Sequence, residues 1–271
     1  MIIDLTYKCS MGCSHCMSDC KPDGAKMTIP TLKDTIEFFK RNDCHTVLVS
    51  GGEIFEHSNI IECLTTLFEG FRDYNDYLMI ILITNGRQLA DNHDYLRFLE
   101  QYMKYDKFYR RRIIIQVTDD PRFYPNPLTQ TQRYRLEKLG AIIDTVPSNS
   151  DDKDRCLYPQ GRALINFSDK NWNTKAPKCA NLRLLANQGF KSLKGIIQYL
   201  SMSGKFCTPS ISPYGDIKLG ESALCPAVAS IYDSAEEIIE KIKNCNCQSC
   251  KIPLTILKSS NPKAYDLIIK P

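Results

Sequence analysis

Strands and helices alternate along most of this chain, and that alternation limits the folds open to it. Short apolar runs rich in β-branched residues predict strands at Ile2–Thr6, His45–Ser50, Leu78–Thr84, Arg112–Thr118, Ala141–Val146 and Ala163–Phe167. Amphipathic stretches between and after them predict helices at Thr31–Arg41, Asn59–Phe71 (with Ser58 as its cap), 91–104, 128–139 and 189–201. Such alternation produces parallel sheets through right-handed crossovers. The expected fold is an α/β array of six strands, either a partial (β/α)6 TIM-like barrel or an open doubly wound sheet.

Composition narrows the class of protein. The 271 residues, 43% hydrophobic and 24% charged, can bury a substantial core. A net charge of +4 is too small to predict nucleic-acid binding. The N-terminus lacks the order of a secretory signal, and the longest apolar run, near Leu78–Ile83, is far shorter than the roughly 20 residues that span a bilayer. We therefore expect a cytoplasmic protein with no membrane or nucleic-acid partner.

The 13 cysteines are unevenly distributed along the chain. Reducing compartments disfavour disulfides, so clustered cysteines there are more often metal ligands or catalytic groups. Four scattered cysteines, Cys44, Cys63, Cys156 and Cys179, are interpreted as small buried hydrophobes. The others fall into an N-terminal group, Cys9, Cys13, Cys16 and Cys20, and a C-terminal group, Cys207, Cys225, Cys245, Cys247 and Cys250.

Polar and thiol groups follow four consecutive predicted strands. In parallel α/β folds the chemistry takes place at the carboxyl ends of the strands. The segments at these ends are Cys9, Ser50-Gly51-Gly52-Glu53, Thr84-Asn85-Gly86 and Thr118-Asp119-Asp120. We expect these groups to line one edge of the sheet.

The spacing of the N-terminal thiols favours an iron–sulfur cluster. Cys9, Cys13 and Cys16 have the pattern CxxxCxxC, and three thiolates can hold three irons of a cubane cluster while the fourth iron remains open. A zinc site usually uses paired Cys-x2-Cys modules, which the offset of Cys9 fits poorly. Cys20 repeats the three-residue spacing, but a fourth thiolate would close the open iron, so we interpret it as a bystander.

These residues resemble two motifs of the radical S-adenosylmethionine (SAM) superfamily. The first is CxxxCxxC with the aromatic His15 before its last cysteine, and the second is the GGE segment in Ser50-Gly51-Gly52-Glu53, although Ile54 stands where proline is common. The resemblance covers about the first 200 residues. It implies a partial barrel in which the amino and carboxylate groups of SAM chelate the open iron of a 4Fe–4S cluster. His15 would lie beside the adenine, and Glu53 would accept hydrogen bonds from the methionine ammonium. The two glycines would allow the backbone to approach the ligand.

Other cofactor contacts are predicted from the positions of residues along the chain. Gln116 and Thr118 alternate along one strand and so share a face, and by position they resemble the ribose-contacting group of the family. Asn85 has a similar position after its own strand. Arg162 belongs to Tyr158–Ala163, which resembles the GRA element of related enzymes with a C-terminal cluster domain, and it would direct its guanidinium at SAM or substrate.

The C-terminal cysteines predict a second cluster. A hairpin with its turn at Pro213-Tyr214-Gly215-Asp216 and a helix at Ser234–Lys243 separate the thiols. Their order resembles the twitch domain, the short form of the SPASM domain, which implies an auxiliary 4Fe–4S cluster on Cys207, Cys225, Cys247 and Cys250. Cys245 could replace Cys247, and spacing alone also permits a zinc ribbon. The expected domains are a radical SAM barrel at 1–203 and a cluster domain at 204–271.

The resemblance implies reductive cleavage of SAM to a 5′-deoxyadenosyl radical, which abstracts hydrogen from a substrate carbon. A fully ligated auxiliary cluster favours net oxidation by accepting an electron. A peptide or protein residue is the favoured substrate, and a sugar or aminocyclitol is the alternative. Because the first strand begins at Ile2, we expect no fused N-terminal peptide-recognition domain. Flavodoxin or ferredoxin would donate electrons. A non-catalytic zinc-bound interaction module, which would be colourless, is the alternative of another class.

Overall fold

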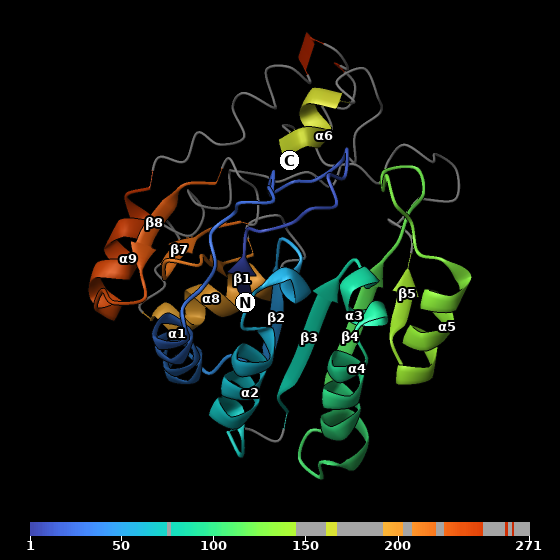
Figure 1. Cartoon of the computed structure of the whole chain (residues 1–271). Helices are drawn as coiled ribbons and strands as arrows, with labels where there is room; N and C mark the ends of the chain where they lie inside the picture. Colours follow the sequence, from blue (N-terminus) through green and yellow to red (C-terminus); the bar gives the residue numbers. More distant parts are fainter. Residues whose placement is uncertain are drawn as a thin grey trace. The chain divides into compact units, whose positions relative to one another are not determined.

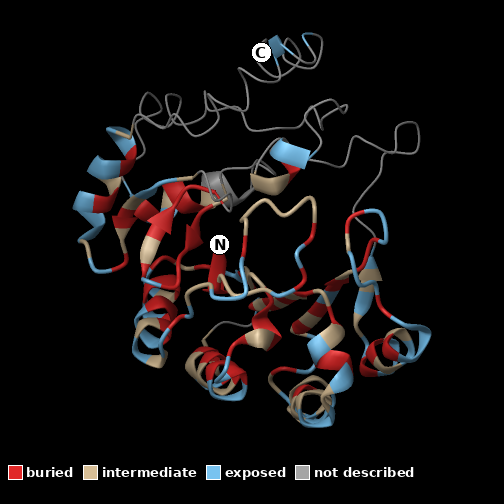
Figure 2. Cartoon of the chain, turned by 45° about the horizontal axis from the view of Figure 1, so that its top comes forward, coloured by how far each residue is buried: buried red, intermediate tan, exposed pale blue. Residues whose placement is uncertain are grey.

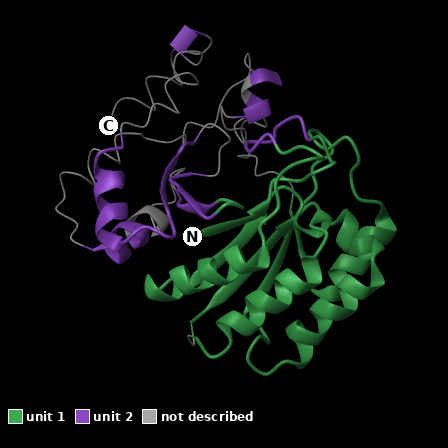
Figure 3. Cartoon of the chain, turned by 60° about the vertical axis from the view of Figure 1, so that its left-hand side comes forward, with its two compact units in different colours: residues 1–12, 20–146, 212–214 green, residues 13–19, 147–211, 215–271 purple. Residues whose placement is uncertain are grey.

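The computed structural model describes residues 1–74, 77–144, 161–166, 192–202, 208–220, 225–245, 258–259 and 262 (Figure 1). The chain divides into two compact units, coloured separately in Figure 3. Unit 1 consists of residues 1–12, 20–146 and 212–214, and unit 2 of residues 13–19, 147–211 and 215–271. The domain boundary after residue 203 stays a prediction.

Unit 1 contains a parallel sheet in the order β5-β4-β3-β2-β1. This arrangement confirms the first five predicted strands and the parallel α/β fold. The strands are β1 (Ile2–Thr6), β2 (Thr46–Gly51), β3 (Met79–Thr84), β4 (Ile113–Thr118) and β5 (Ile142–Asp144). Because all five run in the same direction, the segments after them meet at one edge of the sheet.

Helices follow the strands of unit 1, as the alternating pattern predicts. They are α1 (Ile29–Arg41), η1 (Ile54–Glu56), α2 (Ile60–Phe71), α3 (Arg87–Asp91), α4 (His93–Glu100), the π-helix η2 (Gln101–Tyr105) and α5 (Gln130–Leu139). Figure 2 shows α1, α2, α4 and α5 along one face of the sheet, with buried residues on their inner sides. The core of unit 1 lies between this face and the helices.

The two faces of the sheet differ in burial. On β4, Ile115 and Val117 are fully buried, whereas Gln116 between them is exposed and Thr118 is half-buried. On β3, Ile80 is likewise buried and its neighbours on the strand are half-buried. The alternation follows from the period of two along a strand. Gln116 and Thr118 therefore share the less buried face, as predicted from the sequence.

Unit 2 contains short elements. They are α6 (Gly161–Asn166), α8 (Leu193–Met202), β6 (Ser210–Ile211), β7 (Asp216–Lys218), β8 (Ala227–Ser230) and α9 (Ala235–Lys243). The last three strands pair antiparallel in the order β6-β7-β8. The predicted hairpin and the helix after it are confirmed, while β8 was not predicted. Ser234 begins α9 with a capping box in which its side chain and that of Glu237 bond reciprocally to backbone N–H groups.

The predicted sixth strand is wrong in the part that the structure describes, because residues 161–166 form α6. Short apolar runs fit a strand or a buried helix equally well by periodicity, and the Ala and Leu of this run favour a helix. The N–H of Arg162 donates to the carbonyl of Cys16 at 2.9 Å, which fixes the first turn against another part of unit 2. Phe167 lies outside the described residues.

Two predicted helix boundaries also need correction. The helix expected over 91–104 is interrupted at Asn92, whose side chain accepts hydrogen bonds from the N–H groups of Asp94 and Tyr95 and so starts α4 afresh. Ser58 does not cap α2. Its hydroxyl accepts a hydrogen bond from Lys26 Nζ at 3.2 Å, and Asn59 occupies the N-cap position without a side-chain capping bond to the backbone.

Candidate functional site

The segment that carries the N-terminal cysteines begins and ends on a short two-stranded stem in unit 1. Tyr7 N donates to Ala25 O at 2.7 Å, and Lys21 N donates back to Tyr7 O at 3.2 Å. Cys9 N donates to Lys21 O at 2.9 Å, so the first cysteine of the motif is fixed at the top of this stem. The stem directly continues β1, which places Cys9 at the carboxyl end of the first strand, as predicted.

The GGE segment contacts the same stem. Gly52 N donates to Thr6 O, and Glu53 N donates to Lys8 O at 2.8 Å. Gly51 has a φ of +121°, and a Cβ there would lie 2.2 Å from Thr6 O. A Cβ on Gly52 would lie 2.2 Å from Lys8 O. Both glycines are therefore required by the close approach of two backbone segments, a reason that the sequence interpretation, which considered only a ligand, did not include.

A carboxylate secures the residue after Cys9. The side chain of Glu56, at the end of η1, accepts hydrogen bonds from the N–H of Ser10 at 3.0 Å and from its hydroxyl at 2.6 Å. Hydrogen bonds to a charged acceptor are stronger than neutral ones. The sequence interpretation missed Glu56, and no motif marks it. Its contact with Ser10 follows from the path of η1, which brings this carboxylate to the stem.

Glu53 lies at the centre of a buried network in unit 1. Its side chain accepts hydrogen bonds from Thr84 Oγ1 at 2.7 Å, Asn85 N at 2.7 Å and Phe55 N at 3.0 Å, and the residue is 1% exposed. Burial raises the pKa of Glu53 to about 7, while the hydrogen bonds from Thr84, Asn85 and Phe55 act in the opposite direction. The carboxylate ties the end of β2 to the end of β3. Three of its roughly four acceptor positions are used, which leaves room for one further donor.

Ser50, Asn85, Gln116 and Thr118 lie on β2, β3 and β4 or just after them. Ser50 pairs in register with Asp4 and is half-buried. The side-chain oxygen of Asn85 accepts a hydrogen bond at 3.1 Å from the N–H of Arg87, the first residue of α3. The structure thus places all four near the strand ends of unit 1, and their contacts with SAM stay predictions.

Two buried carboxylates follow β4. Asp119 accepts hydrogen bonds from Leu128 N at 3.0 Å and from the guanidinium of Arg133. Asp120 accepts from Arg122 N at 3.0 Å and from the guanidinium of the same residue. Both carboxylates therefore hold together the long connection between β4 and α5.

The other two cysteines of the motif belong to unit 2. Cys13 is buried and Cys16 is half-buried, and Cys16 N donates to Cys13 O at 3.3 Å in a tight turn that contains His15. In the same unit, Arg162 Nε donates to Cys13 O at 2.9 Å and its Nη1 to Asp19 at 3.4 Å. The side chain predicted to reach SAM or substrate thus contacts the cysteine segment itself.

The convergence of the three thiols stays a prediction, because Cys9 belongs to unit 1 and Cys13 and Cys16 to unit 2. Within the described parts of the chain, the structure groups no three His, Cys, Asp or Glu side chains as a metal site. Cys20 is buried, and its thiol donates to Gly51 O at 3.5 Å.

In the C-terminal group the structure describes Cys225 and Cys245. Cys225 lies two residues before β8, and Cys245 follows the end of α9, where its N–H donates to Ile242 O at 3.2 Å. Both are half-buried. Cys207, Cys247 and Cys250 lie outside the described residues, so the auxiliary cluster stays a prediction.

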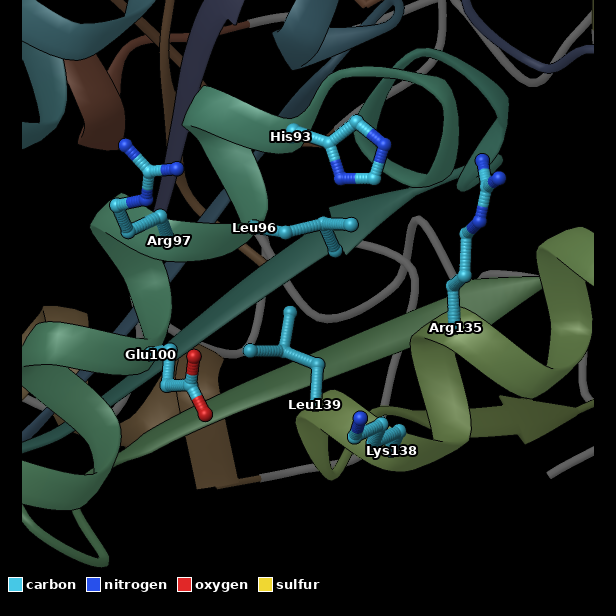
Figure 4. Close-up of a pocket in the computed structure, with 7 residues that line it drawn as sticks. All are labelled: His93, Leu96, Arg97, Glu100, Arg135, Lys138 and Leu139. Carbon is cyan, nitrogen blue, oxygen red and sulfur yellow. The ribbon is translucent and has the colours of Figure 1, made fainter.

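A cavity of about 330 Å³ lies between α4 and α5 of unit 1 (Figure 4). Leu96 and Leu139 extend into it from the two helices, and the remaining lining residues are His93, Arg97, Glu100, Arg135 and Lys138. Several of these polar groups have partners nearby, since Glu100 pairs with Lys104 at 2.8 Å and Arg135 donates to Ala90 O at 3.2 Å. No residue of the cysteine or GGE motif lines this cavity.

Part of the chain is similar in sequence to a known protein. No family model matches the chain. The antilisterial bacteriocin subtilosin biosynthesis protein AlbA of Bacillus subtilis (strain 168) is 25% identical over 118 residues, which are 43% of this chain and 23% of AlbA. The chain thus matches less than a quarter of that relative's length.

Solved structures share the fold. Native anSMEcpe with bound AdoMet and Cp18Cys peptide has a TM-score of 0.52 at 14% identity, over 94% of this chain and 82% of that one. Native anSMEcpe with bound AdoMet and Kp18Cys peptide has a TM-score of 0.51 at 13% identity, over 99% and 98%. These similarities show that the chain has the same fold as these proteins, in line with the parallel α/β fold predicted from the sequence. Among the described residues, no helix has the length and apolarity needed to cross a membrane.

Proposed function

We propose that this protein is a radical SAM enzyme that modifies a residue of a peptide or protein. The observation that carries the proposal is the hydrogen-bonded contact between the GGE segment and the stem below Cys9, through Gly52 and Thr6 and through Glu53 and Lys8. The GGE motif and the residues just before Cys9 meet there at the carboxyl ends of neighbouring parallel strands, where α/β enzymes hold their cofactors. The likeness to AlbA and to peptide-bound anSMEcpe supports a peptide substrate.

The residues at these strand ends suit the proposed cofactors. Cys9, Cys13 and Cys16 would hold a 4Fe–4S cluster, and thiolates are its usual ligands. Glu53 would receive the methionine ammonium at its remaining acceptor position, because its other oxygen lone pairs already face Thr84, Asn85 and Phe55. His15 would lie beside the adenine, and Asn85, Gln116 and Thr118 would contact the ribose.

When bound and reduced, the cluster and SAM would supply a 5′-deoxyadenosyl radical that removes hydrogen from a substrate carbon. The protein's share is to hold the substrate carbon in place and to exclude water and competing hydrogen donors. The less buried face of the sheet, which carries Gln116 and Thr118, is the surface we assign to this task.

A C-terminal domain from residue 204 would hold the auxiliary 4Fe–4S cluster on Cys207, Cys225, Cys247 and Cys250. With four thiolates that cluster has no open iron, so it would accept an electron from the substrate and make the overall reaction an oxidation. A cytoplasmic flavodoxin or ferredoxin would supply the electron that starts SAM cleavage.

The test begins with protein purified and reconstituted without oxygen. We expect brown protein that converts SAM to 5′-deoxyadenosine when dithionite is added, measured by liquid chromatography and mass spectrometry. Incubation with pooled peptides or with pooled polyols then shows which pool accelerates 5′-deoxyadenosine formation. Colourless protein that binds zinc and leaves SAM intact would refute the proposal, and acceleration by polyols alone would refute the peptide substrate.

A further inference from the structure

We propose that α6 is a clamp for the cysteine segment and that Arg162 is a positioning residue for the cluster ligands. The inference rests on the proposed function, because it concerns the loop that would hold the cluster. It differs from the role that the sequence suggested for Arg162, which was contact with SAM or substrate. All the contacts that carry it lie within unit 2.

One short helix binds three backbone carbonyls of the cysteine segment. Arg162 N donates to Cys16 O at 2.9 Å, Arg162 Nε donates to Cys13 O at 2.9 Å, and Asn166 Nδ2 donates to Ser14 O at 2.8 Å. These donors belong to the second and the last residue of α6. The carbonyls of two proposed ligands, Cys13 and Cys16, are therefore both held by the same residue.

The first residue of α6 must be glycine for this contact to form. Gly161 has a φ of +55°, and a Cβ there would lie 2.3 Å from Cys16 O and 2.4 Å from Met17 O. Real Cβ atoms do not approach oxygen so closely, so any side chain would push α6 away from the segment. The glycine thus serves the contact with the cysteine segment as well as the local turn.

Asp19, near the end of the cysteine segment, forms an ion pair with Arg162. Its carboxylate lies 3.4 Å from Arg162 Nη1, and the Arg162 side chain is 23% exposed. The guanidinium has a fixed planar geometry, so one side chain can hold a carbonyl with Nε while Nη1 faces a carboxylate. Arg162 thereby connects residues on either side of Cys16.

This arrangement would affect the cluster through position and charge. Loss of a group that holds a metal ligand in place by a hydrogen bond commonly lowers metal affinity by 10–100-fold. A cation close to the backbone of two ligands also favours an added electron, because net charge and hydrogen bonding set the reduction potential of an iron–sulfur cluster. Loss of Arg162 should therefore loosen both thiols and lower the midpoint potential.

The first experiment uses the iron-free chain, so that it does not depend on the cluster. Iodoacetamide alkylation of Cys13 and Cys16 is followed by mass spectrometry in wild type, Arg162→Gln, Asn166→Ala and Gly161→Ala. We expect alkylation to be roughly tenfold faster in Arg162→Gln, which corresponds to about 1.4 kcal/mol of lost local stability. Asn166→Ala keeps the test valid if Arg162→Gln fails to fold, and it should show a smaller increase.

The second experiment measures iron content and midpoint potential in reconstituted protein without SAM. Arg162→Gln should lose iron faster on buffer exchange and have a lower potential, and Arg162→Lys should restore the potential by returning the charge. Arg72→Gln is the matched control. It removes an arginine that pairs with Glu69 at 2.9 Å and Asp106 at 3.0 Å in unit 1, and it should change neither quantity.

The outcomes separate the two proposals. Unchanged alkylation and potential in Arg162→Gln, together with weaker SAM binding, would overturn the clamp and return Arg162 to a cofactor contact. If wild type binds no iron, the proposed function fails, while the alkylation rates of the iron-free chain still decide whether α6 holds the segment.

Discussion

The two cysteine-rich regions of this chain differ in what holds their thiols. Next to the N-terminal group, a backbone hydrogen bond joins Tyr7 to Lys21 in the stem. A further backbone hydrogen bond joins the stem to Gly52 of the GGE segment. The described part of the C-terminal group consists of short elements, with β6 of two residues and β7 of three, and Cys225 and Cys245 lie just outside β8 and α9. The backbone of a ligand loop can thus be held in place by neighbouring strand ends, or its conformation can depend on the metal that the loop binds.

This difference predicts how each region responds to metal. Binding energy at a metal site is folding energy where the ligands are not otherwise fixed. The N-terminal region should keep its backbone arrangement without a cluster, because its hydrogen bonds are made between protein groups. The C-terminal region should depend more strongly on its proposed cluster. The following predictions test or refine this comparison.

Replacement of Cys9, Cys13 and Cys16 together by Ala should have the largest effect. We expect a loss of about four irons per chain and of all SAM cleavage, because no other thiols stand in this spacing. Iron content and 5′-deoxyadenosine formation are measured together. The control Cys20→Ala, which removes the thiol bonded to Gly51 O, should retain both. Unchanged iron in the triple variant would refute the ligand assignment.

The Cys207→Ala, Cys225→Ala double variant tests the second region. If the auxiliary cluster exists, iron should fall from about eight to about four per chain. Slow SAM cleavage should persist, since that chemistry needs only the N-terminal site, while product formation should fail. Cys245→Ala and Cys247→Ala decide between the two neighbouring thiols. Retention of about eight irons in the double variant would show that Cys207 and Cys225 are not ligands of the auxiliary cluster.

Glu53→Gln tests the buried network of the first region. We expect iron to be retained and SAM to bind more weakly by about 1.5–3 kcal/mol, the worth of a hydrogen bond to a charged group. Isothermal titration calorimetry gives the affinity. Glu62→Gln, which changes an exposed carboxylate on α2, is the matched control and should leave SAM affinity unchanged. Loss of the cluster in Glu53→Gln would show that Glu53 instead holds the cysteine stem in place.

The raised pKa of Glu53 predicts a dependence of stability on pH. Because burial raises this pKa to about 7, the folded chain binds a proton more tightly than the unfolded chain, whose carboxyl titrates near the ordinary value. The stability that protonation contributes is therefore lost as pH rises through about 7. The free energy of unfolding should fall by roughly 2 kcal/mol between pH 5.5 and 8 through this group alone.

Urea denaturation of the SAM-free chain at several pH values checks this expectation. The relevant quantity is the difference between wild type and Glu53→Gln, since other groups titrate equally in both. A difference that stays constant between pH 5.5 and 8 would contradict the raised pKa. SAM should reduce the dependence, because its ammonium would stabilise the charged carboxylate.

The smallest effect is expected at the capping box of α9. Ser234→Ala removes the side-chain acceptor for Glu237 N and should cost about 1 kcal/mol of local stability. Amide hydrogen exchange in α9 should become several-fold faster. Thr129→Ala, which removes the corresponding capping box of α5 in unit 1, should accelerate exchange in α5 and leave α9 unaffected.

The sequence predicted the parts of the fold that local pattern decides. Runs such as Met79–Thr84 are continuous and β-branched, and they form strands of the parallel sheet. The local pattern predicted a strand at α6, but the chain forms a helix there. In this helix Arg162 N bonds to Cys16 O, which is distant in the sequence. A similar reason explains the break at Asn92, whose side chain caps α4 inside a stretch that reads as one amphipathic helix.

The candidate site was predictable where a motif follows a strand. Neighbouring parallel strands bring their ends together, and this accounts for the contact between Gly52 and the residues before Cys9. Glu56 was not predictable, because its bond to Ser10 depends on the path of η1 rather than on any spacing. The contact of Arg162 with Cys13 O was not predictable for the same reason, since a guanidinium in a motif does not show what it contacts.

The stem below Cys9 has a consequence for how metal could load. Cys9 N and Lys21 O close the segment that contains Cys13 and Cys16, so its two ends are joined before any metal arrives. Joining the ends of a loop raises the effective concentration of each thiol near the others, which short flexible linkers bring to the millimolar range. In the proposed cluster site, a thiolate that had bound iron would therefore have the next ligand available within the same closed loop.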